Sequence, residues 1–276
     1  MTHDLTLVLR VYPGIIARQK VFCEDKFTLY KKSLMSCIQW LWNLKCFMYV
    51  LLDNCPMEYH TYTENTLKHI DHEIIAYDKK QWNAQTFAKQ VELLSEQKHS
   101  DICLFLEDDY IHLPWSLEKF VDMMKHNPQI DFWTTYLSPD CQNMIIHNYR
   151  PKLLYYKNDI YGTFASTTMT FYCTKTSLKK YKKELLSYSK WNHDFSMWFS
   201  MTKLGVYNIG NMITALFTNF SQFKLFWYMR YKCLKYIIKT PKTNLYAPLV
   251  SWSTHIDSKW IPPGTDRNKV WESISI

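Results

Sequence analysis

The stretch DICLFLEDDYIH, residues 101–112, decides the fold. Its apolar run, residues 102–106, leads directly into three carboxylates, Glu107, Asp108 and Asp109. A short apolar run of this kind is typical of a strand that is buried on both faces of a sheet. Acids that follow such a strand lie at the edge of the sheet, where open α/β sheets bind their ligands. We therefore predict a functional site at the end of this strand.

The composition sets the class of protein. The 276 residues are 47% hydrophobic and 17% aromatic, which is ample for one large or two small packed domains. The formal charge of +8 favours anionic partners such as nucleotides, phosphates, nucleic acid or an acidic membrane surface. The eight cysteines form no C-x-x-C pair, so we expect free thiols in a reducing compartment. We expect neither a cleaved signal nor a transmembrane span, since no long apolar run occurs.

The order of apolar runs predicts alternating strands and helices. The expected strands cover residues 5–12, 45–53, 73–78 and the opening stretch. Helical spacing of apolar residues is found at 26–44 and between residues 79 and 98. Repeated β and α units with buried strands indicate an α/β fold, in which helices cover both faces of a mostly parallel sheet.

Two of the earlier predicted strands also end in an acid, namely Asp53 and Asp78. Because the carboxyl ends of parallel strands share one edge, we expect these acids to converge with residues 107–109 on one crevice. Clustered carboxylates are costly unless a cation neutralises them, and a divalent cation that carries phosphate oxygens fits. The alternative is a solvated, acid-rich turn. No glycine-rich phosphate loop occurs, which argues against a P-loop or a dinucleotide-binding turn.

The order of these elements, followed by LFLEDDY, resembles the nucleotide-sugar-binding half of GT-A (Rossmann-like) glycosyltransferases. The EDD string is similar to the form of the D-x-D motif in N-acetylglucosaminyltransferase I and its relatives. The resemblance implies that Asp109 binds Mn²⁺ or Mg²⁺ and that Asp53 contacts the base. It implies that Asp108 either contacts the ribose or supports the residues that bind the ligand. It makes Asp78 and Glu107 further candidates for donor binding. Common family-2-like members carry DDGS after the second strand, where this chain has LLDNCP.

The stretch WNHDFSMWFSMTKLG, residues 191–205, places Asp194 at the start of a predicted helix. Inverting GT-A enzymes often keep their general base in a comparable element, so the resemblance implies this role for Asp194. An acceptor hydroxyl must lose its proton as it attacks, and a carboxylate suits that task. The alternative is that Asp194 caps the helix, a role for which Asn192 competes.

The stretch SWSTHIDSKWIPPGTD, residues 251–266, contains His255 and Lys259. Many GT-A enzymes return a late histidine to the metal or the diphosphate, so His255 is a candidate metal ligand. Lys259 is a candidate contact to the diphosphate, and a solvated lysine is the alternative for this position. The chain has ten histidines, so one histidine in this stretch is by itself weak evidence for a metal ligand.

The resemblance also implies a domain organisation. A GT-A catalytic domain is expected over residues 1–220, with a nucleotide-sugar half at 1–112 and an acceptor half at 113–220. Within the acceptor half, YGTFASTTMTFYCTK (161–175) has small residues that admit a ligand closely, and by resemblance it lies beside the donor sugar. The C-terminal basic helical segment and tail, residues 221–276, are expected to close over the donor site.

The segment FKLFWYMRYKCLKYIIKTPK, residues 223–242, has six basic residues and no acids. Two interpretations stay open for it. A basic amphipathic helix can pack its apolar side on the domain. It can also lie on a membrane surface.

The resemblance implies a metal-dependent glycosyltransferase that moves a sugar from a UDP-linked donor to a hydroxyl of a glycan acceptor. Inversion is expected if Asp194 is the base, and retention if Asp194 lies far from the acceptor. We expect a cytoplasmic enzyme without a nucleic-acid partner, in peripheral contact with a membrane if residues 223–242 bind one. One alternative is a metal-dependent nuclease or phosphotransferase, in which acids bind two metal ions. No second tight carboxylate pair follows a predicted strand, which argues against this alternative. The other is a non-catalytic membrane-surface binding module.

Overall fold

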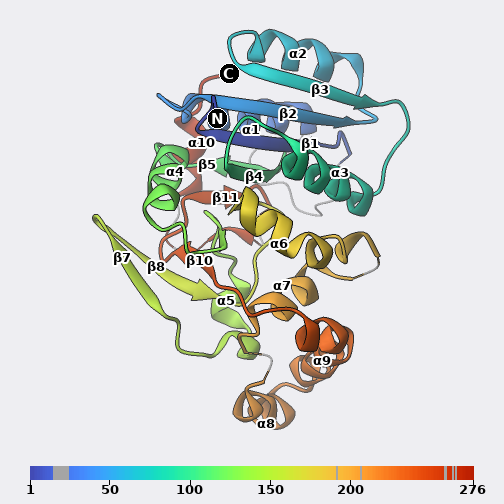
Figure 1. The fold of residues 1–276 in the computed structure, drawn as a ribbon, viewed down its shortest axis with the longest axis vertical. Helices are drawn as coiled ribbons and strands as arrows, with labels where there is room; N and C mark the ends of the chain where they lie inside the picture. Colours follow the sequence, from blue (N-terminus) through green and yellow to red (C-terminus); the bar gives the residue numbers. More distant parts are fainter. Residues whose placement is uncertain (15–24, 191, 206, 258–259, 263, 265) are drawn as a thin grey trace.

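The computed structural model describes residues 1–14, 25–190, 192–205, 207–257, 260–262, 264 and 266–276. A mixed sheet of nine strands forms the centre of the molecule, with the strand order β3-β2-β1-β4-β9-β6-β10-β8-β7 (Figure 1). The strands β3, β2, β1 and β4 are parallel to one another, as predicted. Beyond β4 most pairs are antiparallel. The predicted α/β class is confirmed.

The N-terminal half follows the predicted alternation of strands and helices. Its strands are β1 (Leu5–Val11), β2 (Cys46–Asp53), β3 (Asp71–Tyr77) and β4 (Ile102–Glu107). Its helices are α1 (Lys26–Gln39), α2 (Met57–Leu67) and α3 (Asn83–Glu96). Helix α2 was not predicted, because only Tyr59, Thr63 and Leu67 are buried on it and the rest of the helix is mostly polar.

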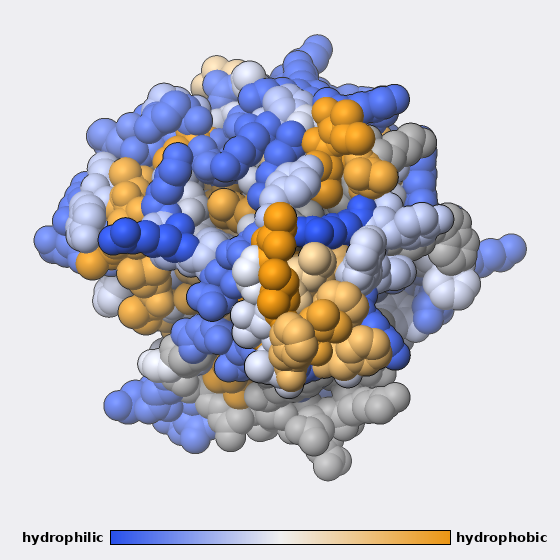
Figure 2. All heavy atoms as spheres, turned by 90° about the horizontal axis from the view of Figure 1, so that it is seen from below, coloured by the Kyte–Doolittle hydropathy of each residue, from blue (hydrophilic) through white to orange (hydrophobic). Residues whose placement is uncertain are grey.

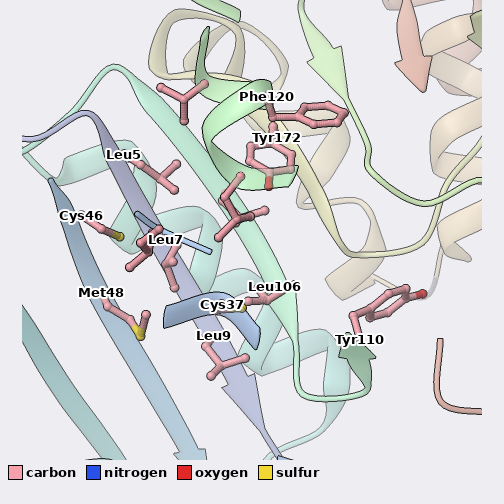
Figure 3. Packing of buried hydrophobic residues seen from close by; sticks show 14 of the residues in the cluster. Leu5, Leu7, Leu9, Cys37, Cys46, Met48, Leu106, Tyr110, Phe120 and Tyr172 are labelled. Carbon is pink, nitrogen blue, oxygen red and sulfur yellow. The ribbon is translucent and has the colours of Figure 1, made fainter. Parts of the chain in front are cut away.

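Alternate residues of β1 supply two hydrophobic cores, one on each face of the sheet. Leu5, Leu7 and Leu9 point to the face that α1 covers, where they pack with Cys37, Cys46, Met48 and Leu106 (Figure 3). Val8 points to the other face and packs with residues of α3 and of two later helices. Burial on both faces explains why β1 is almost uniformly apolar.

The C-terminal half adds shorter strands and a group of helices. The strands are β5 (Tyr110–His112), β6 (Phe132–Trp133), β7 (Leu153–Tyr156), β8 (Asp159–Phe164), β9 (Phe171–Thr174), β10 (Leu245–Pro248) and β11 (Ser253–His255). The α-helices are α4 (Ser116–His126), α5 (Asp140–Asn143), α6 (Lys175–Leu185), α7 (Asp194–Thr202), α8 (Ile209–Thr218), α9 (Phe220–Lys239) and α10 (Arg267–Glu272).

The predicted C-terminal segment, residues 221–276, contributes to the same sheet as the rest of the chain. Strand β10 lies between β6 and β8, parallel to β6 and antiparallel to β8. Strand β11 pairs with β5 in a separate sheet of two strands. The segment therefore builds part of the fold in addition to its predicted helix and tail.

Helix α9 begins three residues before the predicted basic segment 223–242 and ends three residues before the end of that segment. In the part of the chain that the structure describes, neither α9 nor any other helix combines the length and the apolar character that crossing a membrane requires. The cysteines whose side chains the structure describes are free thiols, and most of them are buried.

Candidate functional site

A cavity of about 460 Å³ opens at the carboxyl end of β4. The end of β4, the loop between β8 and β9, the start of α7, and β11 all contribute to its wall. Its titratable lining residues include Glu107, Asp109, Asp194 and His255. The volume lies within the range of small-molecule binding sites in proteins. The cavity therefore brings together four of the side chains that the sequence singled out.

The small sheet of β5 and β11 places His255 against Asp109. Its antiparallel register pairs His255 with Tyr110, and the backbone N–H of Ile256 donates to the carbonyl oxygen of Asp109 at 3.1 Å. Nε2 of His255 lies 3.2 Å from Oδ2 of Asp109. Nδ1 of the same ring accepts the backbone N–H of Asp257 at 2.9 Å. The neutral ring therefore carries its proton on Nε2 and donates it to Asp109.

Each member of this pair favours the charged form of the other. Burial opposes ionisation of Asp109, but the charge of His255 and its hydrogen bond lower the pKa of this carboxyl to about 2. Burial also opposes protonation of His255, whereas the charge of Asp109 and the hydrogen bond to it raise the pKa of the imidazole. Asp109 is therefore ionised at neutral pH.

Asp109 also has a buried oxygen, Oδ1, that accepts no hydrogen bond from the described residues. An unsatisfied carboxylate oxygen fits the ligand preferences of Mn²⁺ and Mg²⁺. His255 could join it as a ligand once Nε2 gives up the proton that it donates to Asp109. Among the residues that the structure describes, no group of three or more His, Cys, Asp or Glu side chains could hold a metal ion. A metal at Asp109 and His255 would therefore need further ligands from substrate phosphates and water, as is common for Mg²⁺ sites.

Glu107 reaches the cavity from the last position of β4 and pairs with Arg10 of β1. The two residues are register partners on adjacent parallel strands, and Nη2 of Arg10 lies 2.5 Å from Oε1 of Glu107. Nη1 of Arg10 donates to the carbonyl oxygen of Asn83 at 2.8 Å. Burial raises the pKa of Glu107 to about 7, and the charge of Arg10 opposes this rise. Our sequence reasoning missed Arg10, although a lone arginine in the apolar run LTLVLRV was a visible signal.

Asp108 does not line the cavity. Nζ of Lys26 lies 2.9 Å from its Oδ1, and the backbone N–H of Tyr12 donates to its Oδ2 at 3.1 Å. Both the lysine and the carboxylate are largely buried. Asp108 therefore connects the end of β1, the start of α1 and the end of β4, and its predicted contact to a ribose stays a prediction.

The remaining donor-binding candidates also lie outside the cavity lining. Asp53 is buried at the end of β2, and its Oδ1 accepts the backbone N–H of Gln81 at 2.6 Å. Asp78 follows β3 and is exposed. Lys259 lies outside the described residues. Of the five acids that were expected to share one crevice, Glu107 and Asp109 line it.

Asp194 is the first residue of α7 and lines the cavity. The residue at the N-cap position is His193, so neither Asp194 nor Asn192 is the cap that the alternative interpretation required. The backbone N–H of Phe195 donates to Oδ1 of Asp194 at 2.6 Å. Burial raises the pKa of Asp194, although this hydrogen bond and the charge of His193 act against the rise. Asp194 is thus a carboxylate of increased basicity that lines the same cavity as the Asp109–His255 pair.

Hydroxyl-bearing residues complete the wall of the cavity. Ser166, Thr167 and Thr168 line it from the loop between β8 and β9, within the predicted small-residue segment. Tyr188 and Trp260, which our sequence reasoning missed, also line it. Their positions depend on how distant segments pack, and their local sequence carries no signal of it.

The fold and the cavity define an α/β protein with a candidate active site at the carboxyl end of a central parallel strand. No family model matches the chain, and no curated protein matches its sequence. Among solved structures, the chain is similar to residues 1–349 of S. aureus TarS in complex with UDP. That match covers 72% of this chain and 54% of the other, with 11% identity and a TM-score of 0.46.

Two further solved structures are similar to the chain. For GalNAc-T7 with UDP, GalNAc and Mn²⁺, the match covers 72% of this chain and 40% of the other, at 7% identity and a TM-score of 0.48. For a putative nucleotide-diphospho-sugar transferase from Desulfovibrio desulfuricans, the match covers 86% of this chain and 99% of the other, at 12% identity and a TM-score of 0.41. The match thus spans about half of the TarS chain and less than half of the GalNAc-T7 chain.

Proposed function

We propose that this protein is a metal-dependent glycosyltransferase that moves a sugar from a UDP-linked donor to a hydroxyl of a glycan acceptor, with inversion. The observation that carries the proposal is the meeting of the Asp109–His255 pair and Asp194 in one cavity at the end of β4. The EDD string at this end of β4 supports it, since its sequence context resembles that of GT-A enzymes.

Asp109 and His255 are the residues that would hold Mn²⁺ or Mg²⁺. When bound, the ion neutralises the negative charge that grows on the leaving nucleoside diphosphate. Asp109 is suited to this role because it is ionised at neutral pH and its Oδ1 accepts no hydrogen bond from the residues that the structure describes. In His255, Nε2 is the ring nitrogen that faces Asp109, and it carries the ring proton in this structure. To bind a metal through Nε2, the ring would have to carry its proton on Nδ1 and give up the N–H of Asp257.

Asp194 would accept the proton of the acceptor hydroxyl. Its raised pKa makes the carboxylate a stronger base than an exposed aspartate, which favours proton transfer from an alcohol as that alcohol attacks. The N–H of Phe195 donates to Oδ1 of Asp194, so Oδ2 is the oxygen proposed to take the proton of the acceptor. A single direct displacement assisted by one base inverts the anomeric centre.

The nucleoside would lie on the side of the β1, β2 and β3 strand ends. There Asp53, Asp78 and Asp108 are the proposed contacts to the base and the ribose, and Lys259 is the proposed contact to the diphosphate. Glu107 lies between this region and the cavity, since it pairs with Arg10 of β1 and also lines the cavity.

Calorimetric titration of the protein with UDP-, GDP- and dTDP-sugars tests the proposal, with Mn²⁺ present or chelated. We expect one donor to bind only with the metal, and its sugar to be released slowly to water. Absence of binding to every donor would contradict the proposal. Cleavage of a nucleic acid or a phosphoester instead would favour the metal-dependent phosphate enzyme.

A further inference from the structure

Helices α8 and α9 expose a group of large apolar side chains. We call this surface the α8–α9 face, and it consists of Ile209, Ile213, Leu216, Phe217, Phe220, Trp227, Tyr231, Leu234 and Ile238. Phe217 is 82% exposed and Tyr231 is 79% exposed. Figure 2 views the molecule from the end at which α8 lies in Figure 1, and it shows apolar residues gathered beside hydrophilic ones. Large apolar patches of this kind on a protein surface commonly mark an interaction site.

The exposed residues of α9 form a stripe that is separate from the side that packs on the protein. The stripe consists of Trp227, Tyr231, Leu234 and Ile238, at intervals of four, three and four residues, which places them on one side of the helix. The packed side consists of Phe226, Met229 and Ile237, which are buried in one cluster with Ala215 of α8 and Phe199 of α7. The helix therefore has a second apolar side that is exposed and does not pack on the rest of the protein.

The α8–α9 face lies in a strongly basic part of the chain. The sequence contains no Asp or Glu between Asp194 and Asp257, and seven Lys or Arg residues. Lys224 and Lys239 are exposed on α9. Nζ of Lys224 lies 5.0 Å from the centre of the Phe220 ring, so this cation sits at the edge of the apolar residues. Lysine side chains beside exposed aromatic residues are typical of helices that lie in the membrane interface.

The positive charge and the apolar stripe of this face together distinguish between the partners that could bind it. A second copy of the chain would bring the same basic face without carboxylates to meet it. A nucleic acid would meet the lysines but leave the apolar stripe in water. An anionic lipid bilayer offers an apolar layer for the stripe and negative headgroups for the lysines. We infer that the protein docks on the surface of an anionic lipid bilayer through the α8–α9 face.

Docking in this way has a consequence for the cavity. Leu225 of α9 lines the cavity, whereas Trp227, two residues later, belongs to the exposed stripe. Helix α9 is therefore shared by the cavity and by the face that meets the membrane. The inference does not depend on sugar transfer, because vesicle binding is measured without any donor.

Co-sedimentation of the full chain with vesicles tests the inference. Vesicles of phosphatidylcholine alone are compared with vesicles that also contain phosphatidylserine. We expect binding to the anionic vesicles only, and weaker binding at higher salt because the headgroup charges are screened. Replacing Phe217→Ser and Tyr231→Ser together removes two large exposed apolar side chains, and should weaken binding at least about tenfold. Lys224→Glu with Lys239→Glu should weaken it as well.

Met57→Ser is the matched control, since Met57 is 75% exposed on α2, at the other end of the molecule from α8 (Figure 1). Unchanged thermal unfolding of all variants shows that the fold is intact. Failure of the wild type to bind anionic vesicles, or equal weakening by Met57→Ser, would overturn the inference. Self-association that Phe217→Ser abolishes, without vesicle binding, would assign the face to a second copy of the chain instead.

Discussion

Nε2 of His255 lies 3.2 Å from Oδ2 of Asp109, although the two residues are far apart in the sequence. The antiparallel pairing of β11 with β5 produces this contact, since it sets His255 beside Tyr110 and next to Asp109. The pair stands at the wall of the cavity, and Oδ1 of Asp109 has no hydrogen-bond donor among the described residues. This arrangement makes Asp109 the first residue to test.

Asp109→Asn should weaken metal-dependent donor binding by at least about tenfold, because the amide has no charge to offer a divalent ion. Donor affinity is measured by calorimetry with and without Mn²⁺. The matched control is Asp101→Asn, an exposed acid before the other end of β4, which should leave the affinity unchanged. Equal metal-dependent binding by Asp109→Asn and the wild type would rule out Asp109 as a ligand.

Asp194→Asn should lower kcat by about 10²- to 10⁴-fold, the usual contribution of a general base. The donor affinity should change little, because Asp194 is proposed to act on the acceptor. The amide has nearly the same shape and can still accept the N–H of Phe195, so the variant should unfold at the wild-type temperature. A loss of donor affinity with an unchanged kcat would show that Asp194 has a different role.

The raised pKa of Asp194 also predicts how the rate depends on pH. A base must be ionised to accept a proton, so kcat should fall as the pH is lowered through this pKa, at a value above the ordinary 3.8. The measurement is kcat at saturating donor and acceptor over the acidic pH range. Asp194→Asn should lose this acidic limb, and its persistence in the variant would assign the limb to another group.

The Asp109–His255 pair predicts a window of greatest stability. Asp109, with its lowered pKa, contributes stability that is present above its ordinary pKa of 3.8 and is lost as the pH falls toward about 2. His255, with its raised pKa, contributes stability that is complete below its ordinary pKa of 6.5 and is lost as the pH rises through the folded value. The coupling between the two residues should therefore be largest between these two ordinary values.

A double-mutant cycle of Asp109→Asn and His255→Gln measures this coupling from urea unfolding. We expect about 1 to 3 kcal/mol near pH 5.5 and a smaller value at alkaline pH, as for a hydrogen bond between charged groups. A coupling that is the same at both pH values would mean that His255 does not titrate against Asp109.

At alkaline pH, above the pKa of Glu107, Arg10→Met should lower the free energy of unfolding by about 3 to 5 kcal/mol, because it leaves the carboxylate of Glu107 charged and without its partner. Glu107→Gln in the same chain removes that charge and should restore part of the loss. Urea unfolding of the two single variants and the double variant measures how much of the lost free energy of unfolding is due to the unpaired charge of Glu107. If the double variant is as unstable as Arg10→Met, the cost comes from the lost contacts of Arg10 with Asn83 and Thr86.

The first four strands and the helices α1 and α3 were predicted within a few residues, because their apolar periodicity is a local property of the chain. Helix α2 was missed because its buried stripe is narrow. Strand β10 was missed as well, since nothing in its four residues indicates that it lies between β6 and β8.

The sequence by itself determined that acids stand at the end of β4, that a basic helix occupies most of residues 223–242, and that Asp194 begins a helix, because each is a pattern of neighbouring residues. The tertiary structure decided which acids share the cavity. Asp108 and Asp109 form the turn between β4 and β5, and this turn points them to different surroundings. Asp109 lines the cavity together with Glu107, whereas Asp108 pairs with Lys26. The contact of His255 with Asp109 depends on the register of β5 and β11, which no local pattern specifies.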